Sequence, residues 1–183
     1  KDFVRLNDFK PYHPSYNGQA SFIASPIFDG PQQVGVLLFQ MPLDRINNIM
    51  TNNQRWSDIG LGESGETYIV GHDHKLRTQS RFLAEDKQNY LRVMKGLGVP
   101  AATLKGLENT GQAIGLQEAK TPGVIDALNG QSGTLIFSDY RGYPVLSSYK
   151  PLEIIDVNWV IMSEIDEAEA LAYVDKLAGF ESA

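Results

Sequence analysis

Residues 132–165 read SGTLIFSDYRGYPVLSSYKPLEIIDVNWVIMSEI. Three runs rich in β-branched and aromatic residues follow one another here, and turn residues separate each run from the next. The pattern predicts strands at Ser132–Tyr140, Tyr143–Leu152 and Val157–Ile165, with turns at Arg141-Gly142 and Ile155-Asp156. Consecutive strands joined by short turns predict an antiparallel sheet.

Two earlier strand candidates, Glu66–Val70 and Lys75–Ser80, flank a turn at Gly71–His74. Together the five candidates predict one antiparallel five-stranded sheet between about Gly65 and Ile165, in an α+β fold with helices on one face. One helix is expected at Asp86–Leu97. A second should start at Thr121-Pro122, where a cap residue precedes a first-turn proline, and end at Gly130. Residues 98–115 are expected to form a loop with some helix.

The first part of the chain predicts a separate unit. Lys1–Ala20 is rich in turn residues, while Ser21–Phe28 and Gln32–Met41 predict a hairpin. An isolated hairpin is only marginally stable in water. We therefore interpret residues 1–58 as the C-terminal part of one module and residues 59–183 as a second module, and we expect the hairpin not to join the five-stranded sheet.

A strand that runs directly into a helix occurs twice. The hairpin leads into a helix that begins near Pro42 and carries Leu43, Ile46 and Met50 on one stripe. The strand Val157–Ile165 leads into a last helix, Asp166–Leu177, with no Gly or Pro to interrupt it. A displacement of that strand is therefore expected to be transmitted directly to the helix.

Composition narrows the classes of function. The chain has 183 residues, of which 42% are hydrophobic and 21% charged, so a packed core is expected and disorder is not. A formal net charge of −6 disfavours nucleic acid as a partner. Cysteine is absent, and no apolar run is long enough to span a membrane.

Two motifs match functional patterns only weakly. The string Gly60-Leu-Gly-Glu-Ser-Gly65 matches a dinucleotide fingerprint, but it precedes a predicted strand instead of following one, so a loop is favoured. His72-Asp-His74 could offer metal ligands, but a solvated turn is favoured because no further ligand is evident. No nucleophile–base pattern is present either. We expect no metal, no cofactor and no enzyme activity.

Polar residues among the apolar ones of the second sheet predict a small pocket. Arginine there would bind a carboxylate and tyrosine hydroxyls would orient it; the alternative is ordinary polar strand ends. We expect Arg77 to point into the same cavity as Tyr149, with Asp139 or Tyr140 at its rim. The candidate ligand-binding residues are Tyr68, Arg77, Ser80, Asp139, Tyr140, Arg141, Ser147 and Tyr149.

Several blocks in the second half resemble the Cache sensor domains of bacterial transmembrane receptors, which have a PAS-like fold. The blocks are residues 62–71 (GESGETYIVG), 76–82 (LRTQSRF), 127–133 (ALNGQSG), 139–149 (DYRGYPVLSSY) and 159–170. Their order resembles the membrane-proximal module of a double Cache domain, and residues 9–15 with 21–50 resemble the end of the distal module. Thr78-Gln79 departs from the family, which often carries an acidic residue there, so ligand preference is expected to differ.

The resemblance implies a periplasmic or extracellular sensing module of a bacterial inner-membrane protein. Such a module binds a small molecule, for example an amino acid or organic acid, and passes a shift to its C-terminal helix. A homodimer through the receptor's helices is a further expectation, as is membrane attachment through segments outside this chain. The output domain stays open, because chemotaxis receptors, histidine kinases and nucleotide cyclases all carry such modules. The alternative is a structural or dimerisation spacer that binds no ligand.

Overall fold

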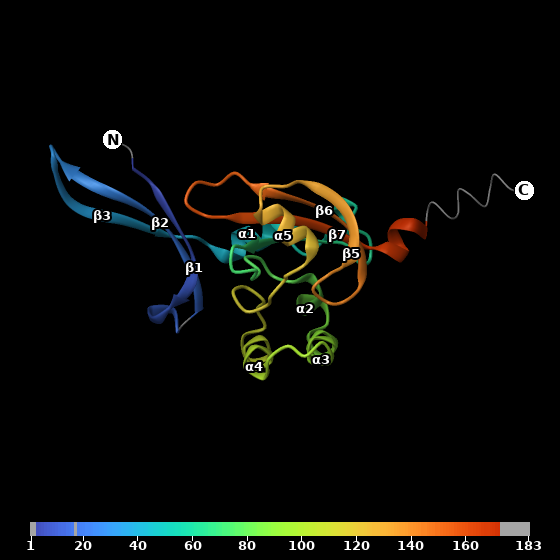
Figure 1. The fold of residues 1–183 in the computed structure, drawn as a ribbon. Coiled ribbons are helices and arrows are strands. Elements are labelled where there is room, and N and C mark those ends of the chain that lie inside the picture. The colour runs from blue at the N-terminus through green and yellow to red at the C-terminus, as the bar shows by residue number, and fades with distance from the viewer. Residues whose placement is uncertain (1–2, 17, 173–183) are drawn as a thin grey trace, which may run out of the picture.

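The computed structural model of the protein describes residues 3–16 and 18–172 (Figure 1). Two separate antiparallel sheets appear, one with the order β1-β2-β3 and one with the order β4-β7-β6-β5. The strands of the first sheet are β1 (Arg5–Tyr12), β2 (Gly18–Asp29) and β3 (Gln32–Gln40). Those of the second are β4 (Glu66–Gly71), β5 (Gly133–Ser138), β6 (Pro144–Leu152) and β7 (Trp159–Asp166).

The second sheet confirms four of its five predicted strands and corrects the fifth. Lys75–Ser80 forms only isolated bridges, from Leu76 to Val70 and from Lys75 to Glu118. The ladder ends because the backbone amide of Ile69 donates to the Thr78 hydroxyl at 3.1 Å. In a longer ladder this amide would donate to a backbone carbonyl instead. Two residues further on, Ser80 begins a helix. Among the described residues the sheet therefore has four strands.

Three of the helices begin at side chains that cap their free amide groups. Ser80 caps α2 (Arg81–Glu85), Asp86 caps α3 (Lys87–Gly96), and Thr121 caps α5 (Pro122–Leu128). This confirms the helices predicted near Asp86 and Thr121-Pro122, while α2 was not predicted. The remaining elements are α1 (Leu43–Met50), α4 (Ala101–Thr110) and the 3-10 helices η1 (His13–Ser15) and η2 (Trp56–Ile59).

Helices α2 to α5 cover one face of the four-stranded sheet (Figure 1). Alternate strand residues, such as Tyr68 and Val70 on β4 and Val160 and Met162 on β7, point toward them. This layer forms the larger hydrophobic core. The opposite face carries a smaller cluster at one end, where α1 packs near Ile69 and Trp159.

The N-terminal sheet confirms the predicted hairpin, formed by β2 and β3, and its separation from the second sheet. The expectation of a turn-rich start holds for His13–Tyr16 but was wrong for Arg5–Tyr12, which forms β1 and pairs with β2 despite Pro11. Its last residues sit on the sheet edge, where a proline is tolerated. Val36, Leu38 and Phe39 of β3 are all more than half exposed.

A compact joint connects the two sheets. Asp8 of β1 accepts two hydrogen bonds from Arg77, at 2.7 and 2.9 Å, and one from the Trp159 indole at 2.9 Å. The rings of Phe9 and Trp159 stack 5.8 Å apart. The first half of the chain is therefore held against the end of β7 by an ion pair next to an aromatic pair.

The last strand runs into a helix without a break. β7 ends at Asp166, and residues 167–172 are helical. The predicted helix extended to Leu177, and its part from residue 173 onward lies outside the described residues. In Figure 1 this helix leaves the molecule at the end opposite the β1–β3 sheet. Within the described ranges, no helix has the length and apolar character needed to cross a membrane.

Candidate functional site

Two buried carboxyl groups face each other on neighbouring strands. Glu66 of β4 and Glu164 of β7 are backbone partners, and Ser147 of β6 continues the same row. The exposed fractions are 3% for Glu66, 4% for Glu164 and 0% for Ser147. The period-two alternation that turns Tyr68 and Met162 toward the helices turns these three residues the same way.

Hydroxyl groups supply most of the donors to this pair. Glu164 accepts from the hydroxyls of Tyr68 and Ser147, each at 2.9 Å. Glu66 accepts from the Tyr140 hydroxyl at 2.7 Å and from the backbone amide of Arg81 at 2.6 Å. The Ser80 hydroxyl lies 2.8 Å from that of Tyr140. We refer to Glu66, Glu164, Tyr68, Tyr140, Ser80 and Ser147 as the buried polar cluster.

Neither carboxyl group forms an ion pair within the described residues. Burial disfavours their charged forms more than the hydroxyl hydrogen bonds favour them. It raises the pKa of Glu66 to about 7 and the pKa of Glu164 to about 8. The buried polar cluster therefore takes up protons at a pH where exposed carboxylates stay ionised.

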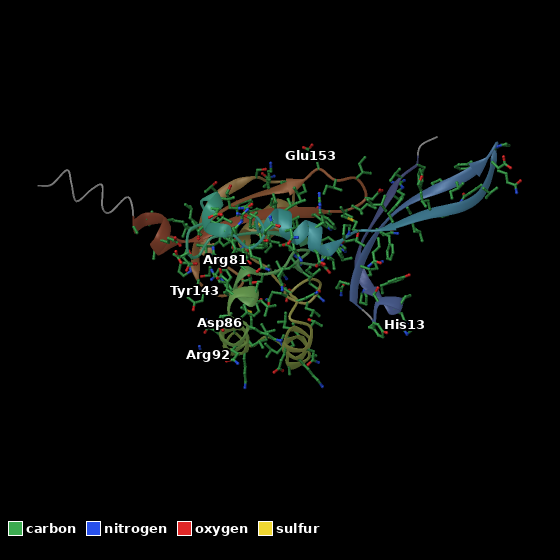
Figure 2. The ribbon with its side chains drawn as sticks, turned by 180° about the vertical axis from the view of Figure 1, so that it is seen from behind. His13, Arg81, Asp86, Arg92, Tyr143 and Glu153 are labelled. Atoms are coloured by element: carbon green, nitrogen blue, oxygen red, sulfur yellow. The ribbon has the colours of Figure 1, made fainter. Side chains whose placement is uncertain are left out.

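An open cleft of about 190 Å³ lies beside this cluster, between α2, α3 and the β5–β6 turn. Figure 2 shows Asp86 and Tyr143 on the side of the molecule where α2 and α3 lie. The cleft combines aromatic, acidic and basic side chains, among them Phe82, Tyr90, Tyr143, Glu85, Asp86 and Arg141. Aromatic rings and carboxylates suit an amine, while the guanidinium suits a carboxylate.

A larger hollow, of about 530 Å³, lies beside β5 and β6. Gly133, Thr134, Ser148 and Ser163 are among its lining residues, and Lys150 is its only charged side chain. Its other polar groups are hydroxyls, and no acidic side chain is among its lining residues. We therefore place the candidate site in the smaller cleft, where charged and aromatic groups meet.

Arg141 ties the cleft to two acidic residues. Its Nε donates to Asp139 at 2.5 Å and its Nη2 donates to Asp166 at 2.8 Å. The guanidinium lies 3.4 Å from the ring centre of Phe82 and 5.1 Å from that of Tyr143. One side chain thus contacts α2, the β5–β6 turn and the last residue of β7.

The structure brings six of the eight predicted site residues into this region. Tyr68, Ser80, Tyr140 and Ser147 belong to the buried polar cluster, and Asp139 and Arg141 adjoin the cleft. Arg77 and Tyr149 do not share a cavity, contrary to the prediction. Arg77 pairs with Asp8 and Asp73 at the joint between the sheets, whereas the Tyr149 hydroxyl donates to Asp126 on α5 at 3.1 Å.

The carboxyl groups of the cluster were missed by the sequence reasoning. The signal that could have identified them is alternation, because Glu66 stands two residues before the buried Tyr68, and Glu164 two residues after the buried Met162. The contributions of α2 and α3 were missed with them. Arg81–Glu85 is too short to show a helical period, and the apolar face of α3 does not reveal which strand ends lie opposite.

No protein-family model and no curated protein sequence matches the chain. Solved structures do match it in fold. The periplasmic sensory domain of the Campylobacter jejuni chemoreceptor Tlp1 has a TM-score of 0.54 at 14% identity, over 91% of this chain and 52% of that one. The ligand-binding domain of the Pseudomonas aeruginosa amino acid chemoreceptor PctB, in complex with L-Arg, has a TM-score of 0.52 at 17% identity, over 92% and 56%.

A third match is the extracellular domain of the putative histidine kinase mmHK1S-Z3, with a TM-score of 0.52 at 17% identity over 97% of this chain and 53% of that one. The chain thus spans about half the length of the structures it matches. It has the fold of the ligand-binding and sensory domains of chemoreceptors and a histidine kinase, in agreement with the Cache-type resemblance of its sequence.

Proposed function

We propose that the chain is the extracytoplasmic sensing module of a bacterial transmembrane receptor, and that it binds a small molecule and passes a shift to its C-terminal helix. The observation that carries the proposal is the cleft beside Arg141, where aromatic, acidic and guanidinium groups converge. Its volume of about 190 Å³ suits a molecule the size of an amino acid or a short organic acid. The fold shared with receptor sensor domains supports the same function.

The site in this proposal consists of the cleft and the buried polar cluster behind it. Arg141 would bind a carboxylate, and Glu85 with Asp86 would attract an amine. Phe82, Tyr90 and Tyr143 would supply apolar contact around the ligand. The buried polar cluster would hold Tyr140 in place, and with it the turn that carries Asp139 and Arg141.

We further propose that residues 1–58 are the C-terminal part of a membrane-distal module and residues 59–183 the membrane-proximal one. The exposed apolar side chains of β3 support this division, because a sheet with such faces is stabilised when further structure covers it. The periplasmic location and the membrane anchor of the receptor belong to the same proposal.

A thermal-shift screen with amino acids, organic acids and amines tests the function. A ligand at 100 times its dissociation constant should stabilise the chain by about 2.7 kcal/mol. Asn89 lines the cleft from α3, whereas its neighbour Gln88 does not, and both are exposed. Asn89→Trp should abolish the shift while Gln88→Trp retains it. A hit that survives Asn89→Trp would place the binding site elsewhere.

The second candidate function is a spacer that binds nothing. It is favoured by one observation, that every buried polar side-chain atom of the described residues has a hydrogen-bond partner within the protein. If the full screen gives no shift for the wild-type chain, the spacer is the better description.

A further inference from the structure

The start of the C-terminal helix is fastened at two places. The carboxylate of Glu169 accepts the backbone amides of Glu63 and Ser64, at 2.8 and 2.9 Å, and also the Ser64 hydroxyl. The Ser64 hydroxyl in turn accepts the Asp166 amide at 3.0 Å. The second fastening is the ion pair between Arg141 and Asp166. The first belongs to the loop before β4, and the second to the cleft.

The two acidic partners of Arg141 are anchored very differently. The Asp139 side chain is 2% exposed, and it also accepts the backbone amides of Arg141 and Tyr143, at 2.8 and 3.0 Å. The Asp166 side chain is 30% exposed, and within the described residues it accepts a hydrogen bond from Arg141 alone. Of the two carboxylates, Asp166 is the one that can leave at little cost.

The guanidinium has five N–H groups, and the bonds to its two acidic partners leave three of them available. Its Nε and Nη2 are used by Asp139 and Asp166, while Nη1 has no hydrogen-bond partner among the described residues. A carboxylate that binds arginine end-on uses both terminal nitrogens, Nη1 and Nη2. Such a ligand in the cleft would bring a further negative charge to the nitrogen that Asp166 also binds. Three carboxylates around one guanidinium also repel each other, which favours departure of the least anchored one.

We propose, on the basis of the sensing function above, that Arg141 is a switch between a ligand carboxylate and Asp166. Without ligand, Arg141 holds the last residue of β7 and so fixes the start of the helix. A small carboxylate that enters the cleft takes Nη1 and Nη2, and Asp166 is released. The Glu169 contacts remain, so the helix pivots about the loop at residues 62–65 and stays docked there.

The test compares the whole chain with Asp166→Asn and Glu167→Gln. The two variants each remove one negative charge from neighbouring residues, but only Asp166 contacts Arg141. The probes are L-alanine, propionate and ethylamine, which separate the carboxylate from the amine. Propionate and L-alanine should bind Asp166→Asn at least about fivefold more tightly than wild type, because a competitor has been removed. Ethylamine should bind all three proteins equally.

Hydrogen exchange supplies an independent readout. Amides of residues 167–172 should exchange faster in ligand-free Asp166→Asn than in wild type or Glu167→Gln. Propionate should speed them in wild type and leave Asp166→Asn unchanged. Equal carboxylate affinity in wild type and Asp166→Asn, or no binding of either carboxylate, would overturn the switch. A different screening hit that Asn89→Trp blocks would still support the sensing function, so the two failures are distinguishable.

Discussion

Glu66 and Glu164 occupy directly opposed positions on β4 and β7, and both are almost fully buried with no ion-pair partner among the described residues. Their ionisation is resisted by burial, which places the pKa of Glu66 at about 7 and that of Glu164 at about 8, against an ordinary value of 4.5. The folded chain thus holds protons that the unfolded chain has already released in this range.

The first prediction follows from that difference in proton binding. Because the folded state binds more protons than the unfolded state, stability should fall as pH rises from about 5 to about 8, by at most about 1.4 kcal/mol per pH unit for each group. Urea unfolding midpoints measured across this range check the slope. Glu164→Gln, which cannot ionise, should flatten it. A wild-type midpoint that stays constant or rises would contradict the buried, unpaired description of the two groups.

The second prediction concerns the loop that docks the helix. Gly62 has a φ of +56°, and a Cβ there would overlap the carboxylate of Glu169. Gly60 is a matched control, with a φ of +83° and open space around the same position. Both alanine variants should lose about 1–2 kcal/mol of folding stability, because alanine is disfavoured in the left-handed backbone conformation. Only Gly62→Ala should also speed amide exchange of residues 167–172, since Glu169 must swing away. Equal exchange in the two variants would mean that Glu169 does not hold the helix.

Much of the fold could be predicted because it follows from patterns of neighbouring residues in the sequence. β-Branched and aromatic runs identify β4, β6 and β7, and the cap residues Asp86 and Thr121 identify the starts of two helices. The prediction of a fifth strand was wrong for a reason that such patterns do not reveal. A single hydroxyl, that of Thr78, replaces a backbone acceptor and ends the ladder.

The site was harder to predict because its partners are distant in sequence. Period two places Tyr68 and Ser147 on the correct face, but it does not say which acceptors they meet. Arg77 and Arg141 look equivalent in sequence, yet Arg77 binds Asp8, 69 residues away and on another sheet. Arg141 meets Asp166 only because the β5–β6 turn lies beside the end of β7. Tertiary packing alone separates the structural arginine from the one in the cleft.

The third prediction concerns the exposed strand β3. Leu38 is 58% exposed on an edge strand, and edge strands with apolar side chains promote association between chains. The isolated chain should self-associate at high concentration, and Leu38→Lys should reduce this without changing the unfolding midpoint. Sedimentation velocity over a concentration series measures the effect. If the chain stays monomeric at all concentrations, the exposed surface of β3 no longer supports the proposal that further structure of the distal module covers it.

The last prediction separates Arg77 from the cleft. Arg77 is 2% exposed, and its pair with Asp8 is bidentate. Burial opposes the charge on Asp8, but the Arg77 guanidinium outweighs it and lowers the pKa of Asp8. Arg77→Met should cost roughly 3 kcal/mol of stability, because it leaves a half-buried carboxylate without its partner. Asp73→Asn should cost less than about 1 kcal/mol, since Asp73 is 41% exposed.

The loss of stability in Arg77→Met should become smaller in acid, because Asp8 is then protonated and no longer needs a cation. Ligand affinity at the cleft should be unchanged in both variants, and a loss of affinity in Arg77→Met alone would return Arg77 to the binding site.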